Sequence, residues 1–446
     1  MSSPFQFGVG SNVVGAPQSG TSMRILREWM VPAEGVREAD GTAQEMAVLF
    51  ERLPPELSQH LQHHFGERLK ELNEIYLQLG QLPECIFEDN TSGKKKRELL
   101  SQEPCSQGHI DLFADFFLSQ QDSAETTKRK GISGTLHRVS LITHPLYRPE
   151  KVLGVAVRVG RALQGLLDTM TWGKQFWVDM AQKHQPLLLI GKPGVGKTTV
   201  LREIASTLAS DTSLNVVVID KTCEIAGDGV TPHPAIGRSR WMPVGVANLQ
   251  HVIMREAVEN QSPDVIIVDE ISTPLEVQAA RTISQRGVQL IATIHGVTLP
   301  EIILDKERGS LVGGVTSVTL SGQEAERRAD KRKQVQKRNT EPVFTAALEL
   351  RSRSSWIYHS NVKDAADSYF ENERFNAVEL CPGKAIDVKV IPMEGHFDYC
   401  RACVGGVPCG LHKNTAVPHH NAAFQEATNN HHHHQAPRRR KAGRGR

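Results

Sequence analysis

The stretch Leu187–Thr199 reads LLLIGKPGVGKTT and decides the fold expected for this 446-residue chain. Four apolar residues, Leu187 to Ile190, predict a buried strand, and residues 191–198 match the phosphate-loop pattern G-x-x-x-x-G-K-[ST]. Glycines let the backbone N–H groups curl around an anion, and the following helix adds its positive N-terminal end. The sequence therefore predicts a nucleoside triphosphate site at Gly191, Lys192, Pro193, Gly194, Val195, Gly196, Lys197, Thr198 and Thr199.

Composition places the chain among ordinary globular proteins, with 39% hydrophobic and 23% charged residues. No apolar run approaches the roughly 20 residues that span a bilayer, so no transmembrane segment is expected. Lys and Arg number 52 against 50 Asp and Glu, but residues 327–338 and 438–446 are strongly basic. Seven cysteines, an odd count without a secretory signal, favour a reducing compartment. Residues 1–27 lack acidic side chains and resemble an organelle transit peptide, with a plain disordered N-terminus as an equal alternative.

The pattern outside the phosphate loop predicts several segments. Leucines at helical spacing follow residue 44, and the sequence alternates as strands do between residues 131 and 161. We expect a flexible tail at 1–43, a helical and β-hairpin N-terminal domain at 44–170, a P-loop core at 171–322, a basic linker or helix at 323–340, closing strands at 341–360, and a mostly disordered basic tail with a Cys/His cluster at 361–446.

Runs of β-branched residues follow the phosphate loop at 215–220, 265–270 and 288–293. Such runs are typical of parallel strands that are buried on both faces. The sequence therefore predicts an α/β fold: a P-loop core with a mainly parallel sheet flanked by helices, preceded by a smaller helical and β domain.

Two carboxylates end the second of these runs, Asp269 and Glu270. In a P-loop nucleoside triphosphatase, one carboxylate at this position completes the Mg²⁺ shell and an adjacent one can polarise the attacking water. We assign the first role to Asp269, with Thr198 as the other Mg²⁺ ligand, and the second role to Glu270. His295 ends the next strand and is a candidate γ-phosphate sensor, while capping of a helix is the equal alternative.

The sequence also resembles a known family. IGKPGVGKTT, the loop EIAGDGVTPHPAIGRSR, the strand DVIIVDEI and the segment RGVQLIATIHG together resemble the ATPase family of stage III sporulation protein AA and its plastid-encoded homologues. That family is similar in turn to pilus-retraction and type II/IV secretion ATPases. The resemblance extends from about residue 45 to residue 359, and it implies an oligomeric, ring-forming, ATP-hydrolysing motor or switch, located in plastids in eukaryotes; a cytoplasmic location is the alternative.

The resemblance places further residues by position. Asp220 and Glu224 fall in the acidic box of the secretion ATPases, and His295 falls in their histidine box. Because those relatives carry the catalytic glutamate in the acidic box, Glu224 competes with Glu270 as the base.

Arginines are candidates for neutralising charge on the transferred phosphoryl group. Candidate fingers from a neighbouring subunit are Arg238, Arg240, Arg281 and Arg286, and two further arginines at the end of the hairpin pattern, Arg158 and Arg161, are weaker candidates for phosphate contact.

The C-terminal region holds a candidate Zn²⁺ site, because Cys400, Cys403, Cys409 and His412 have the paired spacing of zinc ligands. Free cysteines in a loosely ordered tail are the alternative. The basic tail indicates a second hypothesis for the function, in which the chain is a nucleotide-regulated protein that binds single-stranded nucleic acid. A third is a scaffold that binds ATP without hydrolysing it. The Arg-x-x-x-His nucleic-acid module of some family members is not found here.

Overall fold

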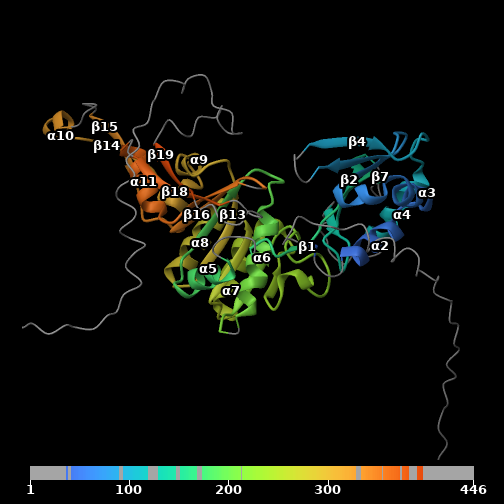
Figure 1. Cartoon of the computed structure of the whole chain (residues 1–446), viewed down its shortest axis with the longest axis horizontal. Coiled ribbons are helices and arrows are strands. Elements are labelled where there is room, and N and C mark those ends of the chain that lie inside the picture. The colour runs from blue at the N-terminus through green and yellow to red at the C-terminus, as the bar shows by residue number, and fades with distance from the viewer. Residues whose placement is uncertain are drawn as a thin grey trace, which may run out of the picture. The chain divides into compact units, whose positions relative to one another are not determined.

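The computed structural model describes residues 37–38, 42–89, 94–118, 129–146, 151–167, 173–211, 213–327, 333–353, 355–371, 374–380 and 389–394. The chain divides into two units at Tyr399, and every described residue belongs to the first unit. Two large sheets organise this unit, one of six strands and one of nine (Figure 1). Within the described residues, no helix is long and apolar enough to cross a membrane.

The nine-stranded sheet carries the phosphate loop, and its strand order is β11-β10-β12-β13-β9-β16-β17-β18-β19. The pairings from β11 through β16 are all parallel, whereas β17, β18 and β19 add antiparallel strands. This mixed, mainly parallel sheet confirms the predicted α/β class. The strands are β9 (Leu187–Gly191), β10 (Val216–Asp220), β11 (Arg240–Pro243), β12 (Val265–Glu270), β13 (Gln289–His295), β16 (Ala346–Ser352), β17 (Ser355–His359), β18 (Arg374–Leu380) and β19 (Lys389–Glu394).

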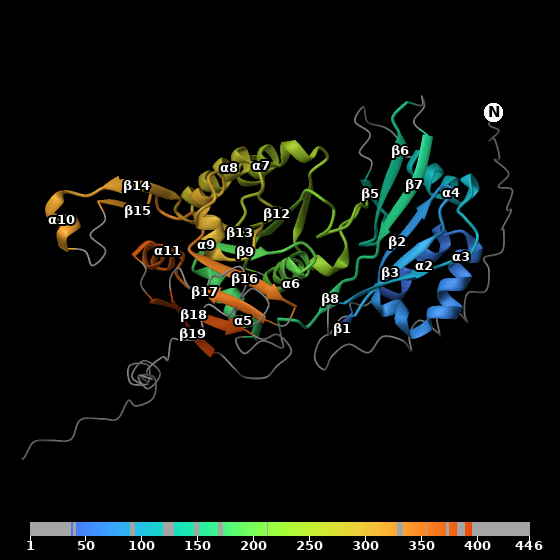
Figure 2. The ribbon, with the colours of Figure 1, turned by 90° about the horizontal axis from the view of Figure 1, so that it is seen from above.

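Helices cover both faces of this sheet, as Figure 2 shows. Successive residues of β9 point to opposite faces, so Leu187 and Leu189 pack with α5 and α6, while Leu188 and Ile190 pack with α7 and α8. A capping box between Thr273 and Glu276 starts α8. The helices are α5 (Gly173–Gln182), α6 (Lys197–Ser210), α7 (Gln250–Asn260), α8 (Pro274–Gln285), α9 (Leu299–Ile303) and α11 (Val362–Glu371), with short 3-10 turns η3 (Pro234–Ile236), η4 (Ala247–Leu249) and η5 (Gly309–Val312).

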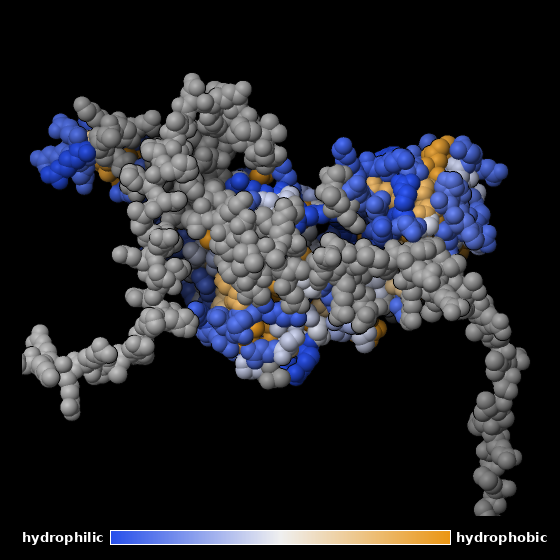
Figure 3. Space-filling view, viewed as in Figure 1, coloured by the Kyte–Doolittle hydropathy of each residue, from blue (hydrophilic) through white to orange (hydrophobic). Residues whose placement is uncertain are grey.

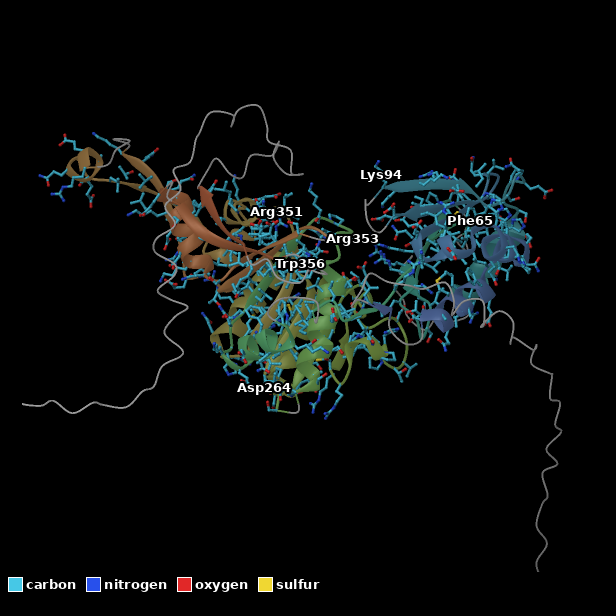
Figure 4. All side chains as sticks on the ribbon, viewed as in Figure 1. Phe65, Lys94, Asp264, Arg351, Arg353 and Trp356 are labelled. Atoms are coloured by element: carbon cyan, nitrogen blue, oxygen red, sulfur yellow. The ribbon has the colours of Figure 1, made fainter. Side chains whose placement is uncertain are left out.

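The six-stranded antiparallel sheet lies in the N-terminal part and has the order β4-β3-β2-β7-β6-β5. Its core includes Phe65, labelled in Figure 4, whose ring lies 4.8 Å from that of Phe87. The elements are α2 (Thr42–Arg52), α3 (Pro55–His60), the π-helical turn η1 (Leu61–Phe65), η2 (Gly66–Glu71), β2 (Leu72–Gln78), β3 (Glu84–Glu88), β4 (Lys95–Leu99), α4 (Gln107–Leu118), β5 (Arg129–Gly131), β6 (Arg138–His144) and β7 (Lys151–Arg158); β1 (Arg37–Glu38) pairs with β8 (Leu163–Gln164) apart from this sheet.

The segment 323–340 was expected as a basic linker or helix; its first residues are helical, but residues 334–338 form one strand of a β-hairpin. Strand β14 (Val315–Thr319) pairs with β15 (Gln334–Arg338), and the short helix α10 (Gly322–Arg327) follows β14. Val335 is 9% exposed between two exposed glutamines, the alternation of a half-buried strand. The described surface of this hairpin is mainly hydrophilic, as Figure 3 shows at upper left.

The core sheet also continues into the segment 361–446, which was expected to be a mostly disordered tail. Strand β18 pairs with β17, and β19 pairs with β18. Leu380 of β18 packs in the same hydrophobic cluster as Trp356 and Tyr358 of β17. This apolar face explains why the strand joins the sheet; Figure 4 labels Trp356 within the core.

Candidate active site

The phosphate loop joins the end of β9 to the start of α6. Gly194 has a φ of +77° and Gly196 a φ of +105°, the left-handed region that favours glycine. A Cβ atom on either would meet nothing within 4 Å, so the backbone conformation and not space requires glycine there. At Gly191 space decides, because a Cβ atom would lie 2.7 Å from Cγ1 of Val195. The loop thus has the curled backbone that a phosphate cradle needs.

The side chain of Lys197 lies at the base of this loop and is 7% exposed. Its Nζ donates to the carbonyl oxygens of Gly191 at 2.7 Å and Lys192 at 3.0 Å, and it lies 3.2 Å from Nδ1 of His295. Burial lowers the pKa of Lys197, and the charges of Glu270, Asp269 and Glu224 oppose that shift. The ammonium group therefore stands where strands β9 and β13 end together, facing carboxylates.

Asp269 and Glu270 lie at the end of β12, the strand that adjoins β13 in the sheet. Asp269 is 5% exposed, and its Oδ2 accepts a hydrogen bond from the Thr222 hydroxyl at 2.6 Å. Burial raises the pKa of Asp269, and the neighbouring carboxylates raise it further. Oε2 of Glu270 lies 3.4 Å from Nε2 of His295. A chain of contacts therefore runs from Lys197 through His295 to Glu270.

Asp220 ends β10 and shapes the loop that follows it. Its fully buried carboxylate accepts hydrogen bonds from the backbone N–H groups of Glu224 at 3.2 Å, Ile225 at 3.0 Å and Ala226 at 2.8 Å. Burial raises the pKa of Asp220, while the N–H groups of Ala226 and Ile225 lower it. Asp220 thus fixes the backbone from which the Glu224 side chain projects.

Glu224 lies between the phosphate loop and the N-terminal sheet. Its Oε2 lies 3.4 Å from the hydroxyl of Thr198, the first hydroxyl after Lys197. Its Oε1 is paired with Arg138 of β6, and Arg158 of β7 lies 4.0 Å away. Arg138 and Arg158 both lie beside Glu224 because they are register partners in the β6–β7 pairing.

Sequence reasoning missed Arg138. The residue lies 86 positions from Glu224, and no motif connects the two. The available signal was the alternation of apolar and polar residues that predicts the β6–β7 hairpin. In that hairpin Arg138 lies opposite Arg158, which was already a candidate for phosphate contact. Arg161 instead donates to the carbonyl of Leu69 at 2.6 Å.

Three of the four candidate arginine fingers contact residues outside this cluster. Nη1 of Arg240 is 3.4 Å from Oε1 of Gln261. Arg281 donates to the carbonyl of Ser310 at 3.3 Å, and Arg286 lies 3.9 Å from Glu259. Arg238 belongs to the loop between η3 and β11. A finger acts from a neighbouring subunit, so their candidacy stays a prediction.

The proposed zinc ligands Cys400, Cys403, Cys409 and His412 lie outside the described residues. Within the part that is described, no group of three or more His, Cys, Asp and Glu side chains has the arrangement of a metal site. Mg²⁺ in nucleotide sites is commonly held by one or two protein oxygens together with substrate phosphates. The hydroxyl of Thr198 and the buried carboxylate of Asp269 are oxygen donors of that kind.

Comparison with known proteins places the chain in a family. The sequence model described as "Sporulation stage III, protein AA" matches residues 138–318. The protein ycf45 of Cyanidium caldarium is 36% identical over 249 residues, which cover 56% of this chain and 71% of that protein. The chain therefore belongs to the family of stage III sporulation protein AA and ycf45. The resemblance predicted from the sequence is thus confirmed.

Two longer relatives match more of the chain. Protein ycf45 of Porphyra purpurea is 40% identical over 332 residues, 74% of this chain and 55% of that protein. Protein SEEDLING PLASTID DEVELOPMENT 1 of Arabidopsis thaliana is 36% identical over 380 residues, 85% of this chain and 51% of that protein. The chain spans about half the length of these two relatives.

The solved structures to which this chain is similar include a pilus retraction motor and an ATPase. The pilus retraction motor PilT with bound ADP has a TM-score of 0.40 and 17% identity, covering 57% of this chain and 76% of that one. The ATPase DotB of Yersinia pseudotuberculosis has a TM-score of 0.41 and 14% identity, covering 71% and 82%.

Proposed function

We propose that this member of the sporulation AA and ycf45 family binds ATP and hydrolyses it in the presence of Mg²⁺, as an oligomer that acts as a motor or switch. The observation that carries the proposal is the convergence of Lys197, Thr198, Asp269 and Glu224 on a glycine-rich loop at the C-terminal edge of a parallel sheet. Open α/β sheets bind nucleotides at that edge.

Each side chain has a role that follows from its chemistry. Lys197 would contact the β- and γ-phosphates, and the positive end of α6 would face them. Thr198 and Asp269 would hold Mg²⁺, which offsets negative charge on the phosphates. Arg138 and Arg158 bring positive charge to Glu224, beside the phosphate loop. His295 lies between Lys197 and Glu270 and is suited to sense whether a γ-phosphate occupies the loop.

The first test is ATP hydrolysis by the purified chain and by Lys197→Ala over a concentration series, with mass photometry on the same samples. We expect hydrolysis to disappear in the variant and the specific activity of the wild type to rise as oligomers form. Wild-type protein that binds ATP without hydrolysing it at any concentration would contradict the enzyme and favour an ATP-binding scaffold.

Two glutamates compete as the base that orients water, and the contacts support Glu224. Glu224 lies beside Thr198 and two arginines, whereas Glu270 faces His295. We expect Glu224→Gln to lower kcat by about 10²-fold or more with little change in ATP affinity. Glu270→Gln, its matched control, should lower kcat less. The opposite order would assign the base to Glu270.

Plastid localisation is proposed from the relatives, one of which is named for plastid development. A fluorescent fusion of the complete protein in plant cells tests this, and cytoplasmic fluorescence would contradict it. Nucleic-acid binding by the basic tail rests on residues outside the described part and stays a prediction.

A further inference from the structure

The carboxylate of Glu45 joins segments that are far apart in the sequence. Glu45 lies on α2 and is 5% exposed. Its Oε1 is 2.8 Å from Nε2 of His233, in the loop that carries Glu224. Its Oε2 accepts the backbone N–H of Leu136 at 3.0 Å, just before Arg138. One buried side chain therefore contacts both the loop of the base and the turn that leads into the strand of its arginine partner.

His233 is the partner of Glu45 in that loop, and its environment fixes its ring proton. The residue is 6% exposed, and its Nδ1 accepts the backbone N–H of Ala235 at 3.1 Å. The proton of the neutral ring must then sit on Nε2, which donates to Glu45. The backbone N–H of His233 donates to the carbonyl of Ala226 at 2.8 Å and closes the loop on itself.

Close backbone packing accompanies this pair. The N–H of Gly131 donates to Oδ2 of Asp228 at 2.8 Å, and a Cβ atom on Gly131 would lie 2.3 Å from Cβ of Asp228. A Cβ atom on Gly227 would lie 2.8 Å from the carbonyl oxygen of Thr135. The turn between β5 and β6 therefore fits tightly against residues 227–228, and there is no room for the loop to shift toward it.

The other side of the loop is held by α6. Nε of Arg202 donates to the carbonyl of Ile225 at 2.9 Å, and its Nη2 donates to the carbonyl of Glu224. Arg202 holds the start of the loop against the helix that follows the phosphate loop, whereas Glu45 holds its later part against the N-terminal domain. Loss of Glu45 should therefore free the later part without dismantling the phosphate loop.

We propose that Glu45 is a positioning residue for ATP hydrolysis: through His233 and the backbone of Leu136 it keeps Glu224 and Arg138 together beside Thr198. The inference rests on the proposed function, because it concerns the geometry of the same site. The hydrogen bonds of the Glu45 side chain are with His233 and Leu136 and not with the phosphate loop, so Glu45 acts through the loop that carries Glu224. Small displacements of a base from its reactive geometry cost large factors in rate.

The chain offers a matched control, a second buried glutamate paired with a histidine. Glu349 is fully buried; its Oε1 lies 3.0 Å from Nε2 of His359 and accepts the backbone N–H of Leu299 at 2.7 Å. Glu349→Ala thus removes a buried histidine contact and a backbone acceptor, as Glu45→Ala does, together with an ion pair to Arg351, but from β16, β17 and α9. Glu45→Gln serves as a milder variant, since its amide oxygen can still accept one of the two hydrogen bonds.

The experiment measures hydrogen exchange of peptides from 222–240, with peptides from α7 and β12 as a reference, alongside ATP turnover and ATP affinity in the full chain. For Glu45→Ala we expect faster exchange in 226–239, unchanged exchange in α7 and β12, a kcat lowered about tenfold to 100-fold, and ATP affinity within about threefold of wild type. Glu45→Gln should show the same changes at smaller size. Glu349→Ala should leave exchange of the loop as in wild type.

Two results would overturn the inference: loop exchange in both Glu45 variants that equals wild type, or loop exchange that rises equally in Glu349→Ala. If Glu45→Ala does not fold, Glu45→Gln decides by the same criteria. If the wild type hydrolyses no ATP, the proposed function fails, and the exchange data alone decide whether Glu45 holds the loop.

Discussion

At the scale of single residues, the fold holds His137 neutral. Its imidazole is 1% exposed; Nδ1 accepts the backbone N–H of Gly160 at 3.2 Å, and Nε2 donates to the carbonyl of Glu45 at 3.0 Å. An added proton would sit on Nδ1, where it would face the N–H group that Gly160 now donates. Burial accordingly lowers the pKa of His137 to about 4, although the charge of Glu45 opposes the shift.

Acid should therefore weaken the fold through this residue. The unfolded chain takes up a proton near pH 6.5, but the folded chain does so only near pH 4, so the contribution of His137 is present above pH 6.5 and is lost as pH falls toward 4. We expect a loss of about 2 kcal/mol in the free energy of unfolding between pH 7 and pH 5. Urea titrations at both values, on wild type and His137→Gln, measure it. An equal pH dependence in the variant would contradict the assignment.

Sequence reasoning located the site residues unevenly, for a physical reason. Lys197 and Thr198 are adjacent in a contiguous motif, and Asp269 ends a run of buried β-branched residues, so local patterns show them. Arg138 and Glu45 reach Glu224 and its loop only through sheet pairing and helix packing across 86 and 188 positions. Local patterns carry no information about such contacts.

At the scale of elements, the same distinction holds. The parallel strands β9, β10, β12 and β13 were predictable because strands buried on both faces are continuously apolar. Strand β15, QVQKR, is mostly polar, and its single buried valine gives too weak a period to recognise. It forms because β14 pairs with it and because Arg338 at its end holds Asp367 of α11 at 2.9 Å.

The outer part of this hairpin should be dispensable for the core. Thr319 and Gln334 are register partners, so the two-residue turn Asn-Gly in place of residues 320–333 keeps the strands paired. We expect a change in stability below about 1 kcal/mol, or about 3 °C in Tm, and unchanged ATP turnover. Arg338→Ala, which releases the hairpin from α11, should cost about 1 kcal/mol because Asp367 is partly exposed. Lost turnover in the shortened chain would assign the hairpin a part in hydrolysis.

At the scale of the whole described unit, the N-terminal region and the P-loop core are joined by further carboxylate contacts besides the pairing of Glu224 with Arg138 and Arg158, and two of these contacts differ in their exposure to water. Arg353, labelled in Figure 4 beyond the end of β16, lies 2.6 Å from Glu88 of β3, and its side chain is 41% exposed. The side chains of Glu45 and His233 are 6% and 5% exposed. Because water screens the Arg353–Glu88 pair, it contributes little to the free energy of unfolding. Removing one partner of the buried Glu45–His233 pair would instead leave the other as an unsatisfied polar group, which is costly.

This contrast predicts which contact makes the two parts unfold together. Arg353→Ala should change the free energy of unfolding by less than about 0.5 kcal/mol and leave a single calorimetric transition. Glu45→Ala should cost about 3 kcal/mol or more, and should broaden or split the transition as the parts unfold separately. Differential scanning calorimetry of both variants measures this at one protein concentration, because oligomer formation also shifts Tm. A split transition in Arg353→Ala, with a single one in Glu45→Ala, would make the exposed pair the coupling contact, and the buried glutamate would then act on the catalytic loop alone.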